Sequence, residues 1–192
     1  MIVDMKRLKV VLGKILYNVI GKHLPVAHCL IKPIGVISKK FRGLCGKLIL
    51  QQCGNNVNIY PKAEFSSKVT LGDNSDIGYA ARINGTCVIG NDVIMGPEVL
   101  IYTVNHSSVR TDIAIKYQGL TSEKPVYIGD GSWICARAII LPGVHVGRNA
   151  IVAAGAVVSK DVPDYAIVAG NPACVVKQRD TVIGDHCDSK TE

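Results

Sequence analysis

An all-β solenoid with an α-helical segment at its N-terminus is the fold that this chain of 192 residues predicts. A large apolar residue stands at every sixth position over two long stretches of the sequence. A helix repeats every 3.6 residues and a strand every two, so a six-residue period indicates neither one continuous helix nor one continuous strand. It fits short strands joined by corners, three of which close a triangular coil of eighteen residues. The repeat positions are Ile59, Phe65, Leu71, Ile77, Ile83, Ile89, Met95 and Ile101, followed after an interruption by Ile128, Ile134, Ile140, Val146, Val152 and Val158.

Glycine, asparagine and aspartate lie between the repeat positions, as in the stretches 72–74, 90–92, 129–131 and 147–149. These residues suit tight corners, because they tolerate a positive φ or form hydrogen bonds with the local backbone. A β-sandwich is the alternative, but its strands do not keep a six-residue register over more than forty residues. The sequence therefore predicts stacked coils over residues 55–165.

Residues 1–54 form a basic segment of different character. Residues 1–50 carry ten Lys or Arg and one acid, while the whole chain has a net charge of +7, so the remainder is slightly acidic. This distribution argues against a nucleic-acid surface on the solenoid. Apolar residues at helical spacing predict one helix near residues 8–19 and a second near 36–52, with Pro25 and Pro33 interrupting between them. The apolar positions of the first helix are Leu8, Val11, Leu12, Ile15, Leu16 and Val19.

Two interpretations of the basic segment stay open. The helices could cover the open end of the solenoid, or a neighbouring subunit, because a terminal coil otherwise exposes apolar columns and strand edges. The segment could also be a basic amphipathic element that touches an anionic inner membrane surface through residues 1–50. No run is long enough to span a bilayer, and the first twenty residues contain too many lysines for a secretory signal. We expect a cytoplasmic protein, with the second interpretation placing it peripherally on the inner membrane.

Seven cysteines occur without paired spacing or a nearby histidine cluster, so the sequence predicts neither a disulfide framework nor a zinc site. We expect Cys87 and Cys135 to act as small hydrophobic residues in a reducing compartment. A nucleophilic cysteine remains an alternative that no neighbouring base supports.

The interruption of the repeat predicts a loop. Ile101 and Ile128 are separated by 27 positions, which is not a multiple of six, and the residues between them are mostly polar. We expect residues 105–125 to leave the solenoid at one corner, and long excursions of this kind are commonly functional. His106 stands at the beginning of this loop.

Several motifs resemble one family in order and spacing. The stretches VYIGDGSWI (126–134), IILPGV (139–144), GAVVSKDVP (155–163) and VAGNPA (168–173) look like the hexapeptide-repeat acyltransferases, and most like the sugar and surface-polysaccharide O-acetyltransferases. The resemblance implies a left-handed parallel β-helix, a homotrimer with active sites between subunits, and acetyl-CoA as donor without a metal. Residues 166–192 then form a C-terminal extension, whose tail we expect to be flexible.

The resemblance also assigns roles to individual residues. His106, within the sequence Thr103-Val104-Asn105-His106-Ser107, matches the stretch that carries the family's catalytic histidine. Imidazole has a suitable pKa to take the proton of an attacking hydroxyl. For the acceptor the resemblance implies Asn84, Asn105 and Trp133. For coenzyme A it implies Ala136, Ala154, Ser159 and Lys160, with Lys177 and Arg179 as cations near its phosphates.

These features predict an acetyl-CoA-dependent O-acetyltransferase that modifies a sugar hydroxyl in surface polysaccharide biosynthesis by direct transfer. An antibiotic O-acetyltransferase of the same fold is the alternative. A γ-class carbonic anhydrase would need three histidines converging on zinc, and the corresponding coils contain only His145. A non-catalytic β-helix is a third alternative, although it has no need of a histidine-bearing loop. The sequence does not indicate which sugar is the acceptor.

Overall fold

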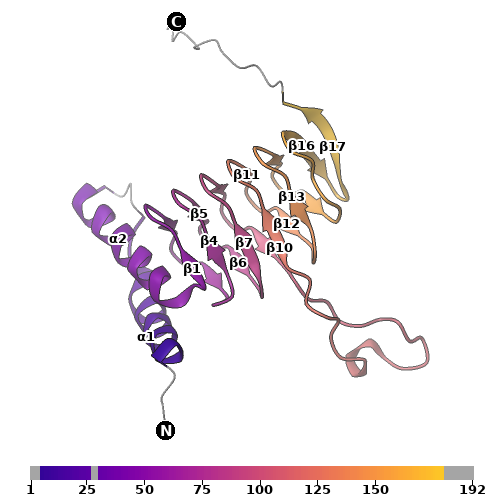
Figure 1. Cartoon of the computed structure of the whole chain (residues 1–192), viewed down its shortest axis with the longest axis horizontal. Helices are drawn as coiled ribbons and strands as arrows, with labels where there is room; N and C mark the ends of the chain where they lie inside the picture. The colour runs from indigo at the N-terminus through magenta and orange to yellow at the C-terminus, as the bar shows by residue number, and fades with distance from the viewer. Residues whose placement is uncertain (1–4, 27–29, 180–192) are drawn as a thin grey trace, which may run out of the picture.

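A computed structural model describes residues 5–26 and 30–179 of the chain. It consists of a triangular prism of stacked coils, with a helical hairpin across one end and a long loop extending from one edge (Figure 1). We refer to the three sides of the prism as faces A, B and C, in the order in which the chain visits them. The expected flexible tail falls within residues 180–192, outside the described residues.

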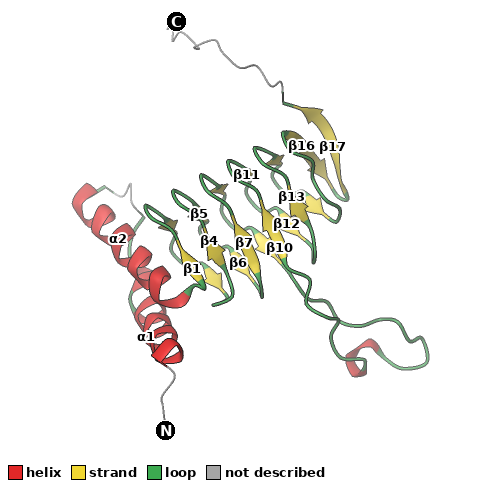
Figure 2. Cartoon of the chain, viewed as in Figure 1, coloured by secondary structure: helices red, strands yellow, loops and turns green. Residues whose placement is uncertain are grey.

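Each face is a parallel sheet of very short strands (Figure 2). Face A contains β1 (Gln52–Cys53), β4 (Thr70–Leu71), β7 (Cys87–Ile89), β10 (Val126–Ile128) and β13 (His145–Val146). Face B contains β2 (Asn58–Ile59), β5 (Asp76–Ile77), β8 (Ile94–Met95), β11 (Trp133–Ile134), β14 (Ile151–Val152) and β16 (Ala166–Gly170), on which β17 (Ala173–Gln178) folds back antiparallel. Face C contains β3 (Glu64–Phe65), β6 (Arg82–Ile83), β9 (Leu100–Ile101), β12 (Ile139–Ile140) and β15 (Val157–Val158).

The strand register confirms the eighteen-residue coil. Leu71 pairs with Ile89 on face A, and Ile83 pairs with Ile101 on face C. Across the loop, Ile89 pairs with Ile128, an offset of 39 residues in place of 18, so the loop adds 21 residues and leaves the stacking intact. The repeat residues are buried in columns inside the prism, with Phe65 only partly covered. The apolar interior supplies the main stabilising free energy of such a fold.

The helical hairpin covers the N-terminal end of the prism. Helix α1 (Met5–Val19) and helix α2 (Lys32–Ile49) are joined through the short 3-10 helix η1 (Gly21–His23). The buried Tyr17 hydroxyl donates a hydrogen bond to the Ala63 carbonyl at 3.0 Å, and the buried Arg42 side chain donates to the Ile59 carbonyl. This is the first of the two interpretations of the basic segment, and the structure confirms it.

Three predicted boundaries are corrected. Helix α2 begins at Lys32, not near residue 36, because Pro33 is accommodated in its first turn, where no backbone N–H is required. It ends at Ile49, and the first strand of the prism begins at Gln52, ahead of the expected start at 55. Within the predicted C-terminal extension, β16 continues the sheet of face B and β17 folds back on it antiparallel. Among the described residues, no helix is long and apolar enough to cross a membrane.

Candidate active site

The extruded loop leaves the prism at the corner between faces C and A, which we call corner CA. It begins after β9, and its two arms run antiparallel as a stem before the chain returns to β10. Within the stem, Ser107 N donates to the Gly119 carbonyl at 3.0 Å and Lys124 N donates to the Thr103 carbonyl at 2.8 Å. These bonds place His106 opposite Leu120 near the base of the loop. The predicted loop at 105–125 is therefore present.

His106 lines a hollow of about 520 Å³ at corner CA. The hollow is also lined by Asn84 and Asn105, so the structure brings these three predicted residues together. Asn84 lies directly after β6, one coil below the loop, and both Asn84 and His106 are exposed to solvent. A space of this size suits a small polar molecule such as one sugar unit.

A carboxylate organises the base of this hollow, and sequence reasoning missed it. Glu123 accepts hydrogen bonds from the Lys68 ammonium at 2.8 Å, from the Thr86 backbone N–H at 2.6 Å and from the Thr103 hydroxyl at 3.3 Å. The bond from Lys68 and the backbone bond from Thr86 lower the pKa of Glu123 to about 2. The Thr103 hydroxyl shares its single proton between Glu123 and the Asn84 carbonyl, whose oxygen is the nearer acceptor at 2.9 Å. Through these bonds Glu123 connects the returning arm of the loop to Lys68 and Thr86 at corner CA, where Asn84 also lies.

One signal for this network was present in the sequence. Lys68 precedes Thr86 by eighteen residues, so the coil period alone makes them neighbours at one corner. Glu123 gave no comparable signal, because its position depends on the path of the loop, which has no repeat.

The other predicted residues do not line this hollow. Ala136 and Ala154 lie together at the corner between faces B and C, beside a hollow of about 470 Å³ that Glu98 and Arg137 also line. Their backbones are linked, since Gly155 N donates to the Ala136 carbonyl at 2.9 Å. Trp133 is 47% exposed on face B, between Ile94 and Ile151.

The predicted cations do not form one cluster. Ser159 and Lys160 follow β15 and lie exposed at corner CA, on the same edge as the loop. Lys177 lies on β17, opposite Ile167 of face B. The Arg179 guanidinium donates to the Asn149 carbonyl at 2.7 Å, which places it beside the corner between faces A and B.

Within one subunit, His106 and Trp133 lie on opposite sides of the prism. Corner CA is the edge opposite face B in a triangular cross-section, and the two residues come from these two parts. A single prism therefore cannot place both residues in one site.

The described part of the chain indicates no metal site, and two cysteines of the prism are poorly suited to act as nucleophiles. No group of three or more potential ligands among His, Cys, Asp and Glu gathers there. Burial raises the pKa of the Cys87 thiol to about 12 and also raises that of Cys135, which disfavours the thiolate form of both. His106 is therefore the described group best placed to act as a base next to an open hollow.

Comparison with known proteins decides the family. Residues 125–160 match the model of the bacterial transferase hexapeptide, six repeats. A provisionally named acetyltransferase of Saccharomyces cerevisiae is 37% identical over 134 residues, which cover 68% of this chain and 67% of the yeast protein. The chain belongs to the hexapeptide-repeat acyltransferases. The resemblance noted in the sequence is thus confirmed.

Two further relatives of this hexapeptide-repeat acyltransferase have sugar substrates in their names. The galactoside O-acetyltransferase of Lactococcus lactis is 36% identical over 126 residues, which cover 66% of this chain but only 54% of that enzyme. A solved galactoside acetyltransferase in complex with coenzyme A superposes with a TM-score of 0.68 at 25% identity, covering 92% of this chain and 84% of that one. The predicted fold, a left-handed parallel β-helix, is confirmed.

Proposed function

We propose that this chain is an acetyl-CoA-dependent O-acetyltransferase that modifies a sugar hydroxyl, and that its product belongs to a surface polysaccharide. The observation that carries the proposal is the exposed His106 beside Asn84 in an open hollow at the base of the loop. The relatives named as galactoside acetyltransferases, one of them solved with coenzyme A, support the donor and the acceptor class. The polysaccharide role extends the resemblance in the sequence and needs its own test.

In the proposed reaction each of these side chains has a role. The acceptor hydroxyl lies against His106, whose imidazole takes its proton as the oxygen attacks the carbonyl carbon of the acetyl thioester. The C–S bond then breaks and coenzyme A leaves as a thiolate. Asn84 and Asn105 hydrogen-bond the sugar, and holding both reactants in place supplies a large part of the acceleration. No covalent enzyme intermediate is required.

A trimer with shared sites is part of the proposal. Trp133 and the groove at Ala136 and Ala154 lie away from corner CA in one subunit. If the prisms pack side by side, face B of one subunit, or its corner with face C, would lie next to corner CA of the neighbouring subunit, which carries His106. The loop tip supports this arrangement, because it extends far from its own prism (Figure 1) and exposes Val109, Ile115 and Tyr117. Apolar side chains of this kind are typical of subunit contacts.

The function is tested by measuring thiol release from acetyl-CoA with galactosides, maltose, polysaccharide fragments and an antibiotic panel as acceptors. We expect turnover with sugars and a fall of about 10²- to 10⁴-fold in kcat/KM for His106→Ala. The matched control is His145→Ala, because His145 is also exposed but stacks on Tyr127 on face A with ring centroids 4.6 Å apart. Near wild-type activity of His106→Ala would overturn the mechanism, and turnover with antibiotics alone would overturn the acceptor.

The shared site is tested by subunit complementation. His106→Ala and Trp133→Ala remove residues that the proposal places on different subunits of one site. Co-expression of the two variants should therefore restore activity above that of either one, since some mixed trimers contain one intact site. Light scattering gives the number of subunits. A monomeric active enzyme, or complete absence of restoration, contradicts the trimer.

A further inference from the structure

Helix α1 has two apolar faces, although a helix at a protein surface normally has one. One face is buried against the hairpin and the prism through Gly13 and Tyr17. The contact is close, since a Cβ atom at Gly13 would lie 2.7 Å from the Cβ of Leu48 on α2. This packing fixes the orientation of α1, so the opposite face must point away from the prism.

The outward face of α1 is a continuous apolar stripe. Its side chains recur three or four positions apart and are 50% to 68% exposed. Helix α2 carries four further exposed apolar side chains, Ile34, Val36, Ile37 and Leu44. The stripe consists of Met5, Leu8, Val11, Leu12, Ile15 and Val19 of α1. An exposed apolar surface of this extent indicates a binding surface.

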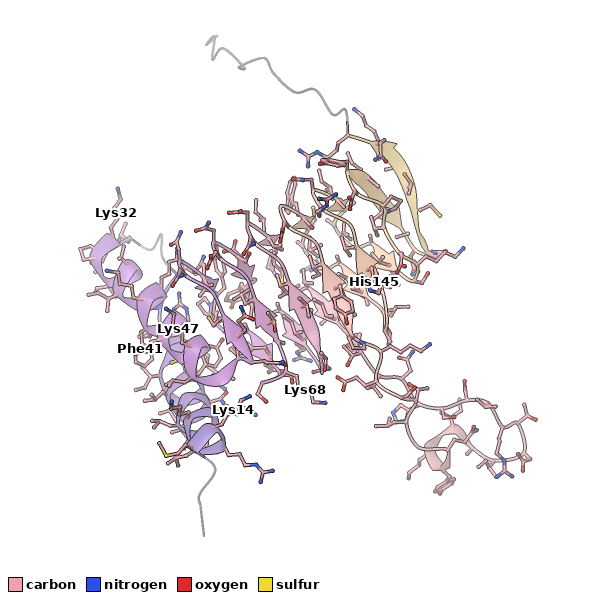
Figure 3. The ribbon with its side chains drawn as sticks, viewed as in Figure 1. Lys14, Lys32, Phe41, Lys47, Lys68 and His145 are labelled. Carbon is pink, nitrogen blue, oxygen red and sulfur yellow. The ribbon has the colours of Figure 1, made fainter. Side chains whose placement is uncertain are left out.

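The charge of the hairpin indicates which kind of partner could bind this apolar surface. No Asp or Glu occurs from residue 5 to residue 63, whereas both helices carry many lysines. Figure 3 shows Lys32 projecting from the hairpin, whereas Lys47 donates to the Asn55 side chain of the prism at 3.4 Å. Lys9 and Lys14 border the apolar stripe on its two sides at helical spacing. A second copy of this surface would bring like charges together, whereas an anionic lipid bilayer complements both its charge and its apolar stripe.

We propose that the stripe of α1 inserts shallowly into an anionic bilayer, with the lysines of the hairpin at the lipid headgroups. Lys and Arg near such a surface each strengthen binding, and the apolar side chains enter the boundary between headgroups and acyl chains. In a trimer of parallel prisms the three hairpins would lie at the same end, so three stripes would bind one membrane together. The contribution of three stripes rests on the proposed function, which includes the trimer.

The bilayer face adjoins the candidate active site. Val11 of the stripe lines a hollow of about 570 Å³ together with Val10 and Lys68. Lys68 also lines the hollow of His106, so the two hollows meet at one residue on corner CA. A sugar held at a membrane surface would thus be within the range of His106 while α1 stays on the bilayer.

The test is co-sedimentation of the full chain with phosphatidylcholine vesicles that do or do not contain phosphatidylglycerol. We expect binding only when the anionic lipid is present, and weaker binding as salt is added. The variant with both Leu12→Gln and Ile15→Gln should partition at least about tenfold less into anionic vesicles. The matched control changes two exposed apolar residues on β17, Val175→Gln and Val176→Gln, and should bind like the wild type.

A second variant tests the charge without changing the stripe. Lys9→Gln with Lys14→Gln should weaken binding and reduce its dependence on salt. Equal binding of the wild type and the stripe variant overturns the proposal, as does equal binding to neutral vesicles. A wild-type protein that binds no vesicles, but forms assemblies that the stripe variant dissolves, shows that a second copy covers the surface and also overturns it. His106→Ala should bind vesicles normally, so failure of the proposed reaction leaves this result unaffected.

Discussion

The corner between faces A and B, corner AB, repeats itself at every coil, whereas corner CA changes at every coil. At corner AB, a Cβ on Gly72 would lie 2.5 Å from the carbonyl carbon of Gly90 in the next coil. Asn74 there has a φ of 56° and donates from its side chain to Asp92 at 3.0 Å. At corner CA the same period instead places Ser66, then Asn84-Gly85, and then the loop.

The difference shows that, within one repeat, the residues of corner AB stabilise the fold, whereas those of corner CA are free to form the candidate site. Close backbone contacts and side-chain bonds from coil to coil leave corner AB little freedom to vary. Corner CA lacks such a ladder of side chains, and it accommodates an insertion of 21 residues without a change in register. Substitutions at corner AB should therefore lower stability, while substitutions at corner CA should lower activity.

The largest effect is expected from Gly72→Ala. The added methyl group would meet backbone atoms of Gly90 and Asn91, which cannot move without separating two coils. Overpacking of this kind should lower the free energy of unfolding by about 3 kcal/mol. Urea unfolding measures the change. Any enzyme that remains folded should keep a near wild-type KM.

The matched control for Gly72→Ala is Gly119→Ala in the loop. Gly119 has a φ of 76°, but no atom lies within 4 Å of a Cβ placed there. Only backbone strain opposes this change, so we expect a loss of about 1 kcal/mol. Equal losses for the two variants would show that contact between coils is not what constrains corner AB.

Glu123→Gln is expected to reduce activity with a smaller effect on stability. The amide cannot form the ion pair with Lys68 and cannot keep all three bonds of the carboxylate, so the base of the loop should shift. A small displacement of a catalytic group lowers kcat/KM by about 10- to 100-fold. Asp112→Asn is the control, because it breaks only an exposed ion pair with Arg110 at the loop tip.

The pH dependence of Glu123 has a definite sign. Its pKa is lowered to about 2 in the folded chain, against about 4.3 in an unfolded chain. Its contribution to stability is therefore fully present above pH of about 4.3 and is lost as the pH falls through about 2. The stability difference between the wild type and Glu123→Gln should stay constant from pH 6 to 8 and narrow in acid. A change within the neutral range contradicts this assignment.

Asp76→Asn should instead stabilise the protein at neutral pH. Burial raises the pKa of Asp76 on face B to about 6. A carboxyl with a raised pKa favours the folded state in acid, and this contribution is lost as the pH rises from about 4 through about 6. Removing the charge should add about 1 to 2 kcal/mol at pH 7. The neighbouring Asn58 has a buried side-chain oxygen without a hydrogen-bond partner, which an amide at position 76 could satisfy.

The gain for Asp76→Asn should disappear below pH of about 4, where the wild-type carboxyl is itself protonated. Thermal unfolding across this range gives the measurement. A gain that persists in acid would assign the effect to packing and not to the charge.

The prism could be predicted from the sequence because each buried repeat position is occupied by a large apolar residue, and these residues recur at a fixed spacing. Ile83 and Ile101 are eighteen residues apart, and the period alone makes them partners on face C. The beginning of α2 was predicted late, because Pro33 indicates a break as readily as a first helical turn. The beginning of the prism at Gln52 was missed because its first strand lacks the regular large apolar residue.

The candidate site was predictable only in part. His106 and Asn84 could be found because a break in the period and a resemblance both point to corner CA. Glu123 could not, since its contacts with Lys68 and Thr86 depend on the return path of a loop without periodicity. The six-residue spacing indicates the face on which Trp133 lies, but it does not indicate which part of a neighbouring subunit contacts that face.

The smallest effect separates the two components of corner AB. Asn74→Ala removes the side-chain hydrogen bonds with Asp92 and Asn56. It also leaves a residue with a Cβ atom at a positive φ, where no side-chain bond now offsets the backbone strain. The free energy of unfolding should fall by about 1 to 2 kcal/mol. Asn74→Gly loses the same bonds without the backbone strain and should cost less by about 1 kcal/mol.

Ala80 provides the matched control at the corner between faces B and C. It has a φ of 51° without a side-chain hydrogen bond of its own, so Ala80→Gly should be neutral or slightly stabilising, by up to about 1 kcal/mol. If urea unfolding gives equal losses for Asn74→Ala and Asn74→Gly, the ladder of side-chain bonds accounts for the asparagine at this position. If Asn74→Gly matches the wild type, backbone conformation alone selects the residues of corner AB, and the bonds between its coils contribute little.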